Sequence, residues 1–338
     1  MDMDWNKLGF TYMPTHSFLR YTWRDGAWDE GRSQTDPHIN IHIAATALHY
    51  GQSVFEGLKA FKTSRGDVVV FRVDENARRM VYSAKKVLME PVPEEVFIEA
   101  VMRVVHANRR FVPDYGTGAS LYVRPLLIGT GPRVGVKPSE EYTFLIFVTP
   151  VGPYFKNGFT PVDLIVEEEV DRAAPRGVGD AKVGGNYAAG MRATKKARDA
   201  GYAEVLYLDA REKKYIDESG PANFFAITKE GRYITPQSRS ILPSITNKSL
   251  IDLGQEMGLH PLRRPIAVSE IFDFAEAGCC GTAAVITPVG SITYRERKAT
   301  YCPDGQPGPI STQLYRKLQA IQTGDAADPH GWVRVVPT

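Results

Sequence analysis

The sequence predicts an α+β protein of two lobes joined by a short linker. The chain has 338 residues, which at roughly 150 residues per domain suggests about two domains. Both halves contain short apolar runs typical of strands and apolar positions at helical spacing. Residues 150–161 hold three prolines and two glycines, a density typical of a connection between domains. We therefore expect a first domain over 1–152, a linker over 153–161 and a second domain over 162–338.

Five segments of the first domain are expected to be strands. Residues 38–43 alternate polar and apolar side chains, which is typical of a half-buried strand. Residues 63–67 have the composition of a hairpin turn and separate two runs rich in β-forming residues. The expected strands are 38–43, 58–62, 68–72, 120–128 and 142–149.

Two helices are expected between these strands. In the first, apolar residues recur three or four positions apart and so share one helical face: Ala77, Met80, Val81, Ala84, Val87 and Leu88. Asp74 or Asn76 is available to cap its N-terminus. The second helix covers about 94–110 and opens directly after Pro93.

The second domain also mixes the two element types. A Gly-rich loop at 177–185 precedes a helix that ends at Gly201. Two further helices are expected near 246–257 and 311–323. Apolar runs predict strands near 162–168, 204–208, 214–217 and 223–228.

Composition excludes several functional classes. Forty-one Lys and Arg oppose 39 Asp and Glu, so no basic surplus exists for binding nucleic acid, and none is expected as a partner. No apolar run approaches the roughly 18 residues of a membrane span, so no membrane association is expected. The N-terminus starts acidic without an apolar stretch, and the three cysteines lack disulfide or zinc spacing. These features favour a reduced, cytoplasmic location and no bound metal.

Four segments could carry chemistry, although each also has a purely structural interpretation. Lys182 is flanked by glycines and is either a surface loop lysine or an amine that forms a Schiff base with a bulky ligand. Glu218 stands at the end of an apolar strand, where a simple hairpin is the alternative. Residues 244–246 open a helix, and 281–284 form a turn of small residues. Backbone N–H groups at both places could hold an anion.

The order and spacing of these segments resemble those of the branched-chain aminotransferases. These are class IV aminotransferases with fold type IV, which use pyridoxal 5′-phosphate. The resemblance runs from about residue 5 to Trp332 and rests on the segments Tyr50–Phe61, Tyr122–Pro125, Gly179–Tyr187, Glu218–Phe225 and Gly281–Pro288. It implies a small N-terminal α/β domain and a larger, barrel-like C-terminal domain that binds the cofactor. The implied reaction exchanges the amino group of Leu, Ile or Val with 2-oxoglutarate.

The resemblance also implies which residues hold the cofactor. Lys182 matches the catalytic lysine, which binds the cofactor covalently and shuttles a proton. Glu218 matches the carboxylate on the pyridine nitrogen, and Tyr187 the tyrosine on the phenolic oxygen. The positions that match phosphate contacts are Arg79, Ile245, Thr246 and Thr282. Arg78 competes with Arg79, because helical periodicity does not separate neighbouring positions and only the resemblance favours Arg79.

Substrate contacts follow from the same resemblance. Phe55, Tyr122, Ala283 and Ala284 match the pocket lining, and Arg124 matches the arginine that can receive the side-chain carboxylate of glutamate. Three residues match positions that reach the neighbouring subunit's site, which implies a homodimer or a higher homo-oligomer: Tyr50, Val134 and Val136.

The sequence departs from the family pattern at three positions. Pro221 stands where some relatives have a substrate-contacting threonine, Ser244 where a glycine is common, and Asn247 where an arginine is common. A D-amino-acid transaminase or an aminodeoxychorismate-lyase-like enzyme shares the fold and remains an alternative. A cofactor-binding protein without turnover, or an interaction module, is the alternative from another class.

Overall fold

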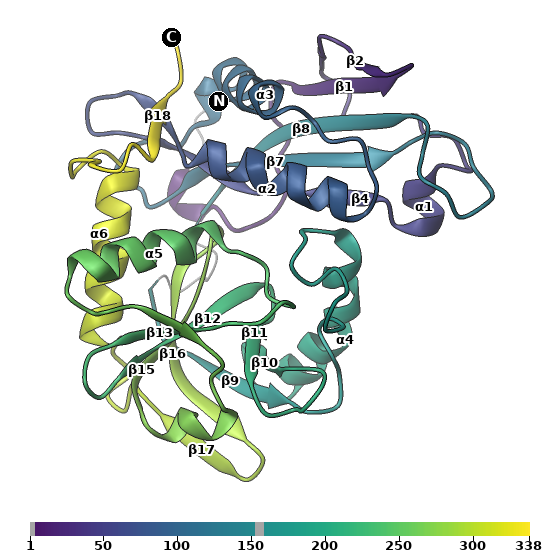
Figure 1. Cartoon of the computed structure of the whole chain (residues 1–338). Coiled ribbons are helices and arrows are strands. Elements are labelled where there is room, and N and C mark those ends of the chain that lie inside the picture. The colour runs from purple at the N-terminus through teal and green to yellow at the C-terminus, as the bar shows by residue number, and fades with distance from the viewer. Residues whose placement is uncertain (1–3, 153–158) are drawn as a thin grey trace. The chain divides into compact units, whose positions relative to one another are not determined.

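The computed structural model describes residues 4–152 and 159–338 (Figure 1). Contacts divide the chain into two compact units. Unit 1 comprises Met1–Tyr154, Ala181–Gly184 and Ala320–Thr338, and unit 2 comprises Phe155–Asp180 and Gly185–Gln319. Most of the expected linker at 153–161 lies outside the described residues. No helix in the described part of the chain is long and apolar enough to cross a membrane.

Unit 1 is built on an antiparallel sheet in the order β18-β6-β5-β7-β8-β1-β2, with β3 paired to β1 and β4 to β7. The long central strands β7 and β8 are buried along most of their length, because apolar side chains point to both faces. The strands are β1 Phe18–Arg24, β2 Ala27–Trp28, β3 Arg32–Gln34, β4 Ser53–Phe55, β5 Leu58–Lys62, β6 Val68–Phe71, β7 Ser120–Gly129, β8 Tyr142–Val151 and β18 Val333–Val335.

The prediction of a strand at 38–43 is wrong, because these residues belong to no strand. Local hydrogen bonds hold this segment instead. The backbone N–H of His38 donates to Asp36 Oδ1 at 3.0 Å, and that of Ala44 donates to His42 Nδ1 at 3.0 Å. Side chains that bond their own neighbourhood compete with sheet formation, so alternation alone did not produce a strand.

The helices of unit 1 are η1 Trp5–Lys7, α1 Thr46–Tyr50, α2 Val73–Lys86, α3 Glu94–Ala107 and η2 Arg109–Phe111. The predicted apolar face of α2 is buried at Ala77, Met80 and Ala84. The predicted cap is wrong, since the N-cap is Arg72 in a left-handed conformation and no side chain caps the helix. Leu88 lies beyond the end of α2 and is exposed.

Unit 2 contains a sheet in the order β11-β10-β9-β16-β15-β12-β13-β14, with β17 paired to β16. An additional pairing of β11 with β12 closes a ring of six strands, which agrees with the barrel-like domain that the sequence predicts. The strands are β9 Val162–Glu167, β10 Glu204–Leu208, β11 Ile216–Ser219, β12 Ala222–Thr228, β13 Tyr233–Pro236, β14 Leu262–Arg264, β15 Phe274–Gly281, β16 Val285–Tyr294 and β17 Arg297–Thr300.

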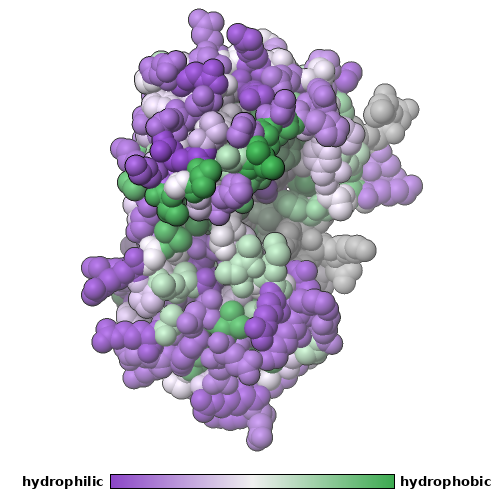
Figure 2. All heavy atoms as spheres, turned by 90° about the vertical axis from the view of Figure 1, so that its right-hand side faces the viewer, coloured by the Kyte–Doolittle hydropathy of each residue, from purple (hydrophilic) through white to green (hydrophobic). Residues whose placement is uncertain are grey.

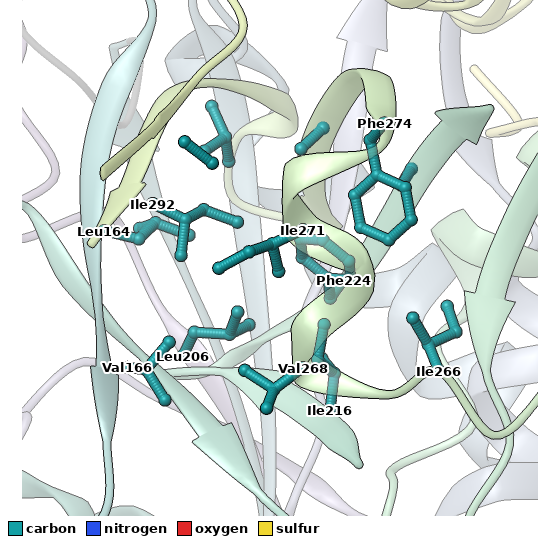
Figure 3. Packing of buried hydrophobic residues seen from close by; sticks show 14 of the residues in the cluster. Leu164, Val166, Leu206, Ile216, Phe224, Ile266, Val268, Ile271, Phe274 and Ile292 are labelled. Atoms are coloured by element: carbon teal, nitrogen blue, oxygen red, sulfur yellow. The ribbon is translucent and has the colours of Figure 1, made fainter. Parts of the chain in front are cut away.

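A hydrophobic cluster fills this part of unit 2. Figure 3 shows side chains from several strands and from the 3₁₀-helix η3 (Val268–Phe272) directed toward one another, among them Leu164, Leu206, Phe224, Ile271 and Ile292. Each of these five is at most 1% exposed, so burial here stabilises the strands that carry Glu218 and its neighbours.

Three α-helices and one 3₁₀-helix complete unit 2: α4 Gly184–Asp199, α5 Ile245–Glu256, η3 Val268–Phe272 and α6 Pro309–Gln322. The helices predicted from the pattern are therefore present, although α4 begins inside the expected loop at 177–185. α5 packs against β15 (Figure 1). Its N-cap is Ser244, whose hydroxyl accepts a hydrogen bond from the Asn247 backbone at 3.2 Å.

Candidate active site

The backbone of Lys182 is anchored to unit 1 from two sides. Its N–H donates to Ser83 Oγ on α2 at 2.9 Å, and its carbonyl accepts from the Phe55 N–H on β4 at 3.1 Å. The next residue, Val183, forms an isolated bridge with Val54. Lys182 is therefore a fixed residue at the end of β4 and not a solvated loop lysine.

The ε-amine of Lys182 lies in surroundings that favour its neutral form. Its Nζ is 4.7 Å from the centre of the Phe55 ring. Burial lowers the pKa of this amine to about 8, the positive charge of Arg79 contributes to the lowering, and Glu56 acts in the opposite direction. An amine with this pKa is partly neutral near pH 8 and can act as a nucleophile and as a proton carrier.

The structure distinguishes between Arg79 and Arg78 as candidates for the site. Arg79 lies inside unit 1 and forms a bidentate pair with the fully buried Glu56, with both the Nε–Oε1 and the Nη2–Oε2 distances at 2.7 Å. Arg78 is half-exposed and pairs with Asp74 and Glu75 on its own helix. Of the two arginines, Arg79 is the one whose charge acts on Lys182.

Phe55, Tyr122 and Arg124 share one face of the unit 1 sheet. Arg124 Nη2 donates to the Tyr122 hydroxyl at 3.1 Å. Its guanidinium carbon lies 5.0 Å from the ring centre of Phe55 and 5.1 Å from that of Tyr122. Two of the predicted lining residues, Phe55 and Tyr122, and the candidate carboxylate receptor Arg124 are thus brought together in unit 1, next to Lys182.

The sequence interpretation missed Lys59, which is directly opposite Tyr122 in the β5–β7 pair. Paired residues of adjacent strands point to the same face, so Lys59 belongs to the face that carries Tyr122 and Arg124. Burial lowers the pKa of Lys59 to about 8. A lysine between the apolar residues Leu58 and Ala60 of an expected strand was the available signal.

In unit 2, Glu218 is buried on β11 among specific partners. Arg172 Nη1 lies 2.9 Å from its Oε2, and Asn223 Nδ2 lies 2.6 Å from its Oε1. The Leu242 backbone N–H also donates to Oε1, at 3.1 Å. The sequence interpretation did not identify Arg172, because its partner is distant along the chain and no local pattern indicates the pairing.

Two structures in unit 2 suit an anion. Ile245 and Thr246 are buried in the first turn of α5, where backbone N–H groups have no acceptor within the helix. Thr282, Ala283 and Ala284 form the turn between β15 and β16. The next residue in the chain, Val285, has a φ of 65°, an unusual conformation for a β-branched residue and one that often marks a functional turn.

Two further residues named from the sequence lie elsewhere. Tyr187 is half-buried in the first turn of α4. Tyr50 ends α1, is 38% exposed, and donates its hydroxyl to the carbonyl of Val134. Within each unit the structure therefore provides a set of groups. Unit 1 has an amine of lowered pKa beside arginines and aromatic rings, and unit 2 has a buried carboxylate together with anion-binding backbone. Each of the two sets contains groups of the kind that pyridoxal 5′-phosphate requires.

Comparison with known proteins identifies the family. The sequence model described as amino-transferase class IV matches residues 53–292. The chain belongs to this family. The branched-chain-amino-acid aminotransferase of Haemophilus influenzae is 45% identical to this class IV aminotransferase over 338 residues, with 98% of each chain covered. That of Helicobacter pylori is 42% identical over 334 residues, covering 98% of this chain and 97% of the relative.

Solved structures confirm the fold class of this class IV aminotransferase. The branched-chain amino acid aminotransferase of Escherichia coli has a TM-score of 0.79 at 30% identity, covering 94% of this chain and 99% of its own. A second branched-chain amino acid aminotransferase, solved with pyridoxamine 5′-phosphate, has a TM-score of 0.77 at 28% identity, covering 94% and 98%. That of the archaeon Thermoproteus uzoniensis, solved with norvaline, also has a TM-score of 0.77, at 27% identity, covering 94% and 100%. The resemblance stated from the sequence motifs is also confirmed.

Proposed function

We propose that this aminotransferase transfers the amino group of L-Leu, L-Ile and L-Val to 2-oxoglutarate, giving branched-chain 2-oxo acids and L-glutamate. Its cofactor is pyridoxal 5′-phosphate. The observation that carries the proposal is the setting of Lys182, an anchored lysine whose pKa of about 8 suits covalent and proton-transfer chemistry. The full-length similarity to branched-chain aminotransferases supports the substrate class.

The bound cofactor supplies an electron sink for the negative charge that develops at the substrate Cα. We assign to Lys182 the covalent attachment of the cofactor and the transfer of a proton between Cα and C4′. Glu218 would accept a hydrogen bond from the pyridine nitrogen and keep the proton on that atom, a role that its burial among hydrogen-bond donors supports. Tyr187 would donate its hydroxyl to the phenolic oxygen.

The phosphate is assigned to four residues. Arg79 contributes a guanidinium, and its inward position supports this choice over Arg78. The remaining contacts come from backbone N–H groups at the start of α5 and in the β15–β16 turn, namely those of Ile245, Thr246 and Thr282.

The substrate side chain is assigned to Phe55, Tyr122, Ala283 and Ala284, which offer an apolar lining. Arg124 receives the side-chain carboxylate of glutamate, so that one site accepts both leucine and glutamate. Its guanidinium already donates to the Tyr122 hydroxyl, which would hold it ready at the edge of the aromatic pair.

We also propose a homodimer, or a higher homo-oligomer, that forms through the surface around α1. Figure 2 views this side of the molecule and shows apolar side chains on the face of unit 1. Ile43, Leu48, Val134 and Val136 are 59–86% exposed, and the bridge between Ala45 and Pro132 joins the two segments. In this assembly Tyr50 reaches the neighbouring subunit's site. We further propose domains at 1–152 and 162–338 joined by 153–161, and a cytoplasmic location.

A transamination assay tests the function. The purified protein is given one amino-group donor at a time: L-Leu, L-Ile, L-Val, L-Glu or D-Ala. The acceptor is 2-oxoglutarate for every donor except L-Glu, for which it is 4-methyl-2-oxopentanoate. We expect turnover with the branched-chain substrates and glutamate but not with D-Ala. Turnover with D-Ala alone would indicate a D-amino-acid transaminase, and no turnover with any donor would contradict the proposal.

The assignment of Lys182 has a separate test. The Lys182→Ala variant should bind the cofactor without a covalent attachment that borohydride can reduce, and it should lose transamination. Lys59→Ala is the matched control, because Lys59 is a second lysine of unit 1 with a pKa lowered to about 8, and its replacement should leave the attachment intact. A reducible attachment in Lys182→Ala would show that another lysine is the nucleophile.

A further inference from the structure

Arg172 is the cationic partner of Glu218 in unit 2. Its Nη1 lies 2.9 Å from Glu218 Oε2, and the side chains are only 8% and 4% exposed. Its Nη2 also donates to the carbonyls of Gly179, at 3.1 Å, and Ser240. Because three groups from different segments hold the guanidinium, it presents a fixed charge to one oxygen of the carboxylate.

The other oxygen of Glu218 is held from the opposite side. Oε1 accepts from Asn223 Nδ2 at 2.6 Å and from the Leu242 N–H at 3.1 Å. Glu218 and Asn223 face each other in the register of β11 and β12, so the first of these bonds is built into the strand pairing. The carboxylate is thus fixed in rotation as well as in place.

From Asn223 the hydrogen bonds continue to the first turn of α5. Asn247 Nδ2 donates to Asn223 Oδ1 at 3.2 Å, and the Tyr233 hydroxyl donates to Asn247 Oδ1 at 2.7 Å. Asn247 is 3% exposed, and its backbone N–H donates to the Ser244 cap. One buried chain of hydrogen bonds therefore links the start of α5 to Glu218 within unit 2.

We propose that Arg172 and Asn247 are positioning residues for Glu218. Arg172 sets the charge and orientation of the carboxylate, and Asn247 fixes its distance from the anion-binding turn of α5. The inference rests on the proposed function, in which Glu218 meets the pyridine nitrogen and the α5 turn meets the phosphate. A rigid connection between Glu218 and the first turn of α5 keeps the two groups at a constant distance, so both can bind the opposite ends of one rigid ligand.

The competing interpretation is that the Arg172–Glu218 pair only stabilises the fold. Breaking a buried ion pair then lowers the melting temperature and changes nothing in the bound cofactor. The bands of the visible absorption spectrum report the protonation and surroundings of the cofactor, so they separate the two interpretations. Arg264 offers a control for loss of an ion pair elsewhere in the same unit, because its pair with Glu270, whose side chains are 34% and 30% exposed, is not connected to Glu218 by these bonds.

The experiment uses the full chain loaded with pyridoxal 5′-phosphate and compares wild type with Arg172→Met, Arg172→Lys, Asn247→Ala and Arg264→Met. For Arg172→Met we expect the ratio of the two main visible bands to change about threefold or more and the cofactor dissociation constant to rise about tenfold. Arg172→Lys keeps the charge and should recover part of both effects. Asn247→Ala should raise the dissociation constant, and Arg264→Met should change neither quantity by more than about twofold.

The inference would be overturned if Arg172→Met kept the wild-type spectrum and the wild-type cofactor dissociation constant and lowered only the melting temperature. That outcome would leave the proposed function intact. If Arg172→Met does not fold, Arg172→Lys and Asn247→Ala decide by the same two quantities, and wild-type values in both would overturn it. A wild-type protein that binds no cofactor would overturn both the inference and the proposed function.

Discussion

The amine of Lys182 allows a quantitative test of the electrostatics in unit 1. Burial, followed by the charge of Arg79, lowers its pKa from an ordinary value of 10.5 to about 8. Between these two pH values the unfolded chain binds the proton and the folded protein does not. The free energy of unfolding contributed by this group should therefore rise as the pH increases from about 8 to 10.5.

The Lys182→Met variant isolates this contribution, because it keeps an unbranched side chain and removes the titrating amine. The change in pKa corresponds to about 3 kcal/mol at about 1.4 kcal/mol per pH unit. Lys182 is only partly buried, so solvent screening reduces the expected effect to about 1–3 kcal/mol. Relative to wild type, the variant should be most stable below pH 8 and should lose this advantage as the pH approaches 10.5.

Urea unfolding of the cofactor-free proteins at about pH 7 to 11 measures this difference. Lys62→Met is the control, since the Lys62 amine lies near the surface and pairs with Asp114 at 2.9 Å. The difference in stability between Lys62→Met and wild type should not follow the course expected for Lys182→Met. If the Lys182→Met difference is equally constant, the amine is not desolvated as the structure indicates, and the reasoning about its reactivity fails.

Three further predictions concern the remaining groups. Glu56→Gln removes the charge that balances the buried Arg79, so it should lower the free energy of unfolding by about 2–4 kcal/mol. Thermal and urea unfolding would measure this decrease. An unchanged free energy of unfolding would contradict the burial of this ion pair. Glu218→Gln should keep the cofactor bound but slow the single-turnover reaction about hundredfold, and wild-type rates would refute its assignment. Arg124→Leu should reduce kcat/KM for glutamate about tenfold to hundredfold and that for leucine only a few-fold, whereas equal losses would indicate a structural role.

Most elements were predictable where the pattern is local. The periodic apolar face of α2, the hairpin of β5 and β6, and the start of α5 near 244–246 each depend on residues within a few positions of one another. The failure at 38–43 has the opposite origin. A strand needs a partner, and alternation within one segment does not show whether another strand is available to pair with it.

The candidate site was predictable only in part, for the same reason. Lys182 and Glu218 stand in segments whose spacing carries the family resemblance. Arg78 and Arg79 are neighbours on α2, and the choice between them depends on which one meets the distant Glu56. Arg172 gives no signal in its own neighbourhood, because its role comes from a pairing with a residue 46 positions further along the chain.

The charged side chains of unit 1 act on the pKa of the Lys182 amine. Arg79 and Arg124 both lower the pKa of Lys182, and Glu56 is the carboxylate that opposes them. This excess of positive charge favours anionic ligands, such as a phosphate or the carboxylates of glutamate. An anion that binds among these groups raises the pKa of the amine, and its departure lowers that pKa again. The affinity of the Lys182 amine for its proton is therefore coupled to the binding of an anion among these groups.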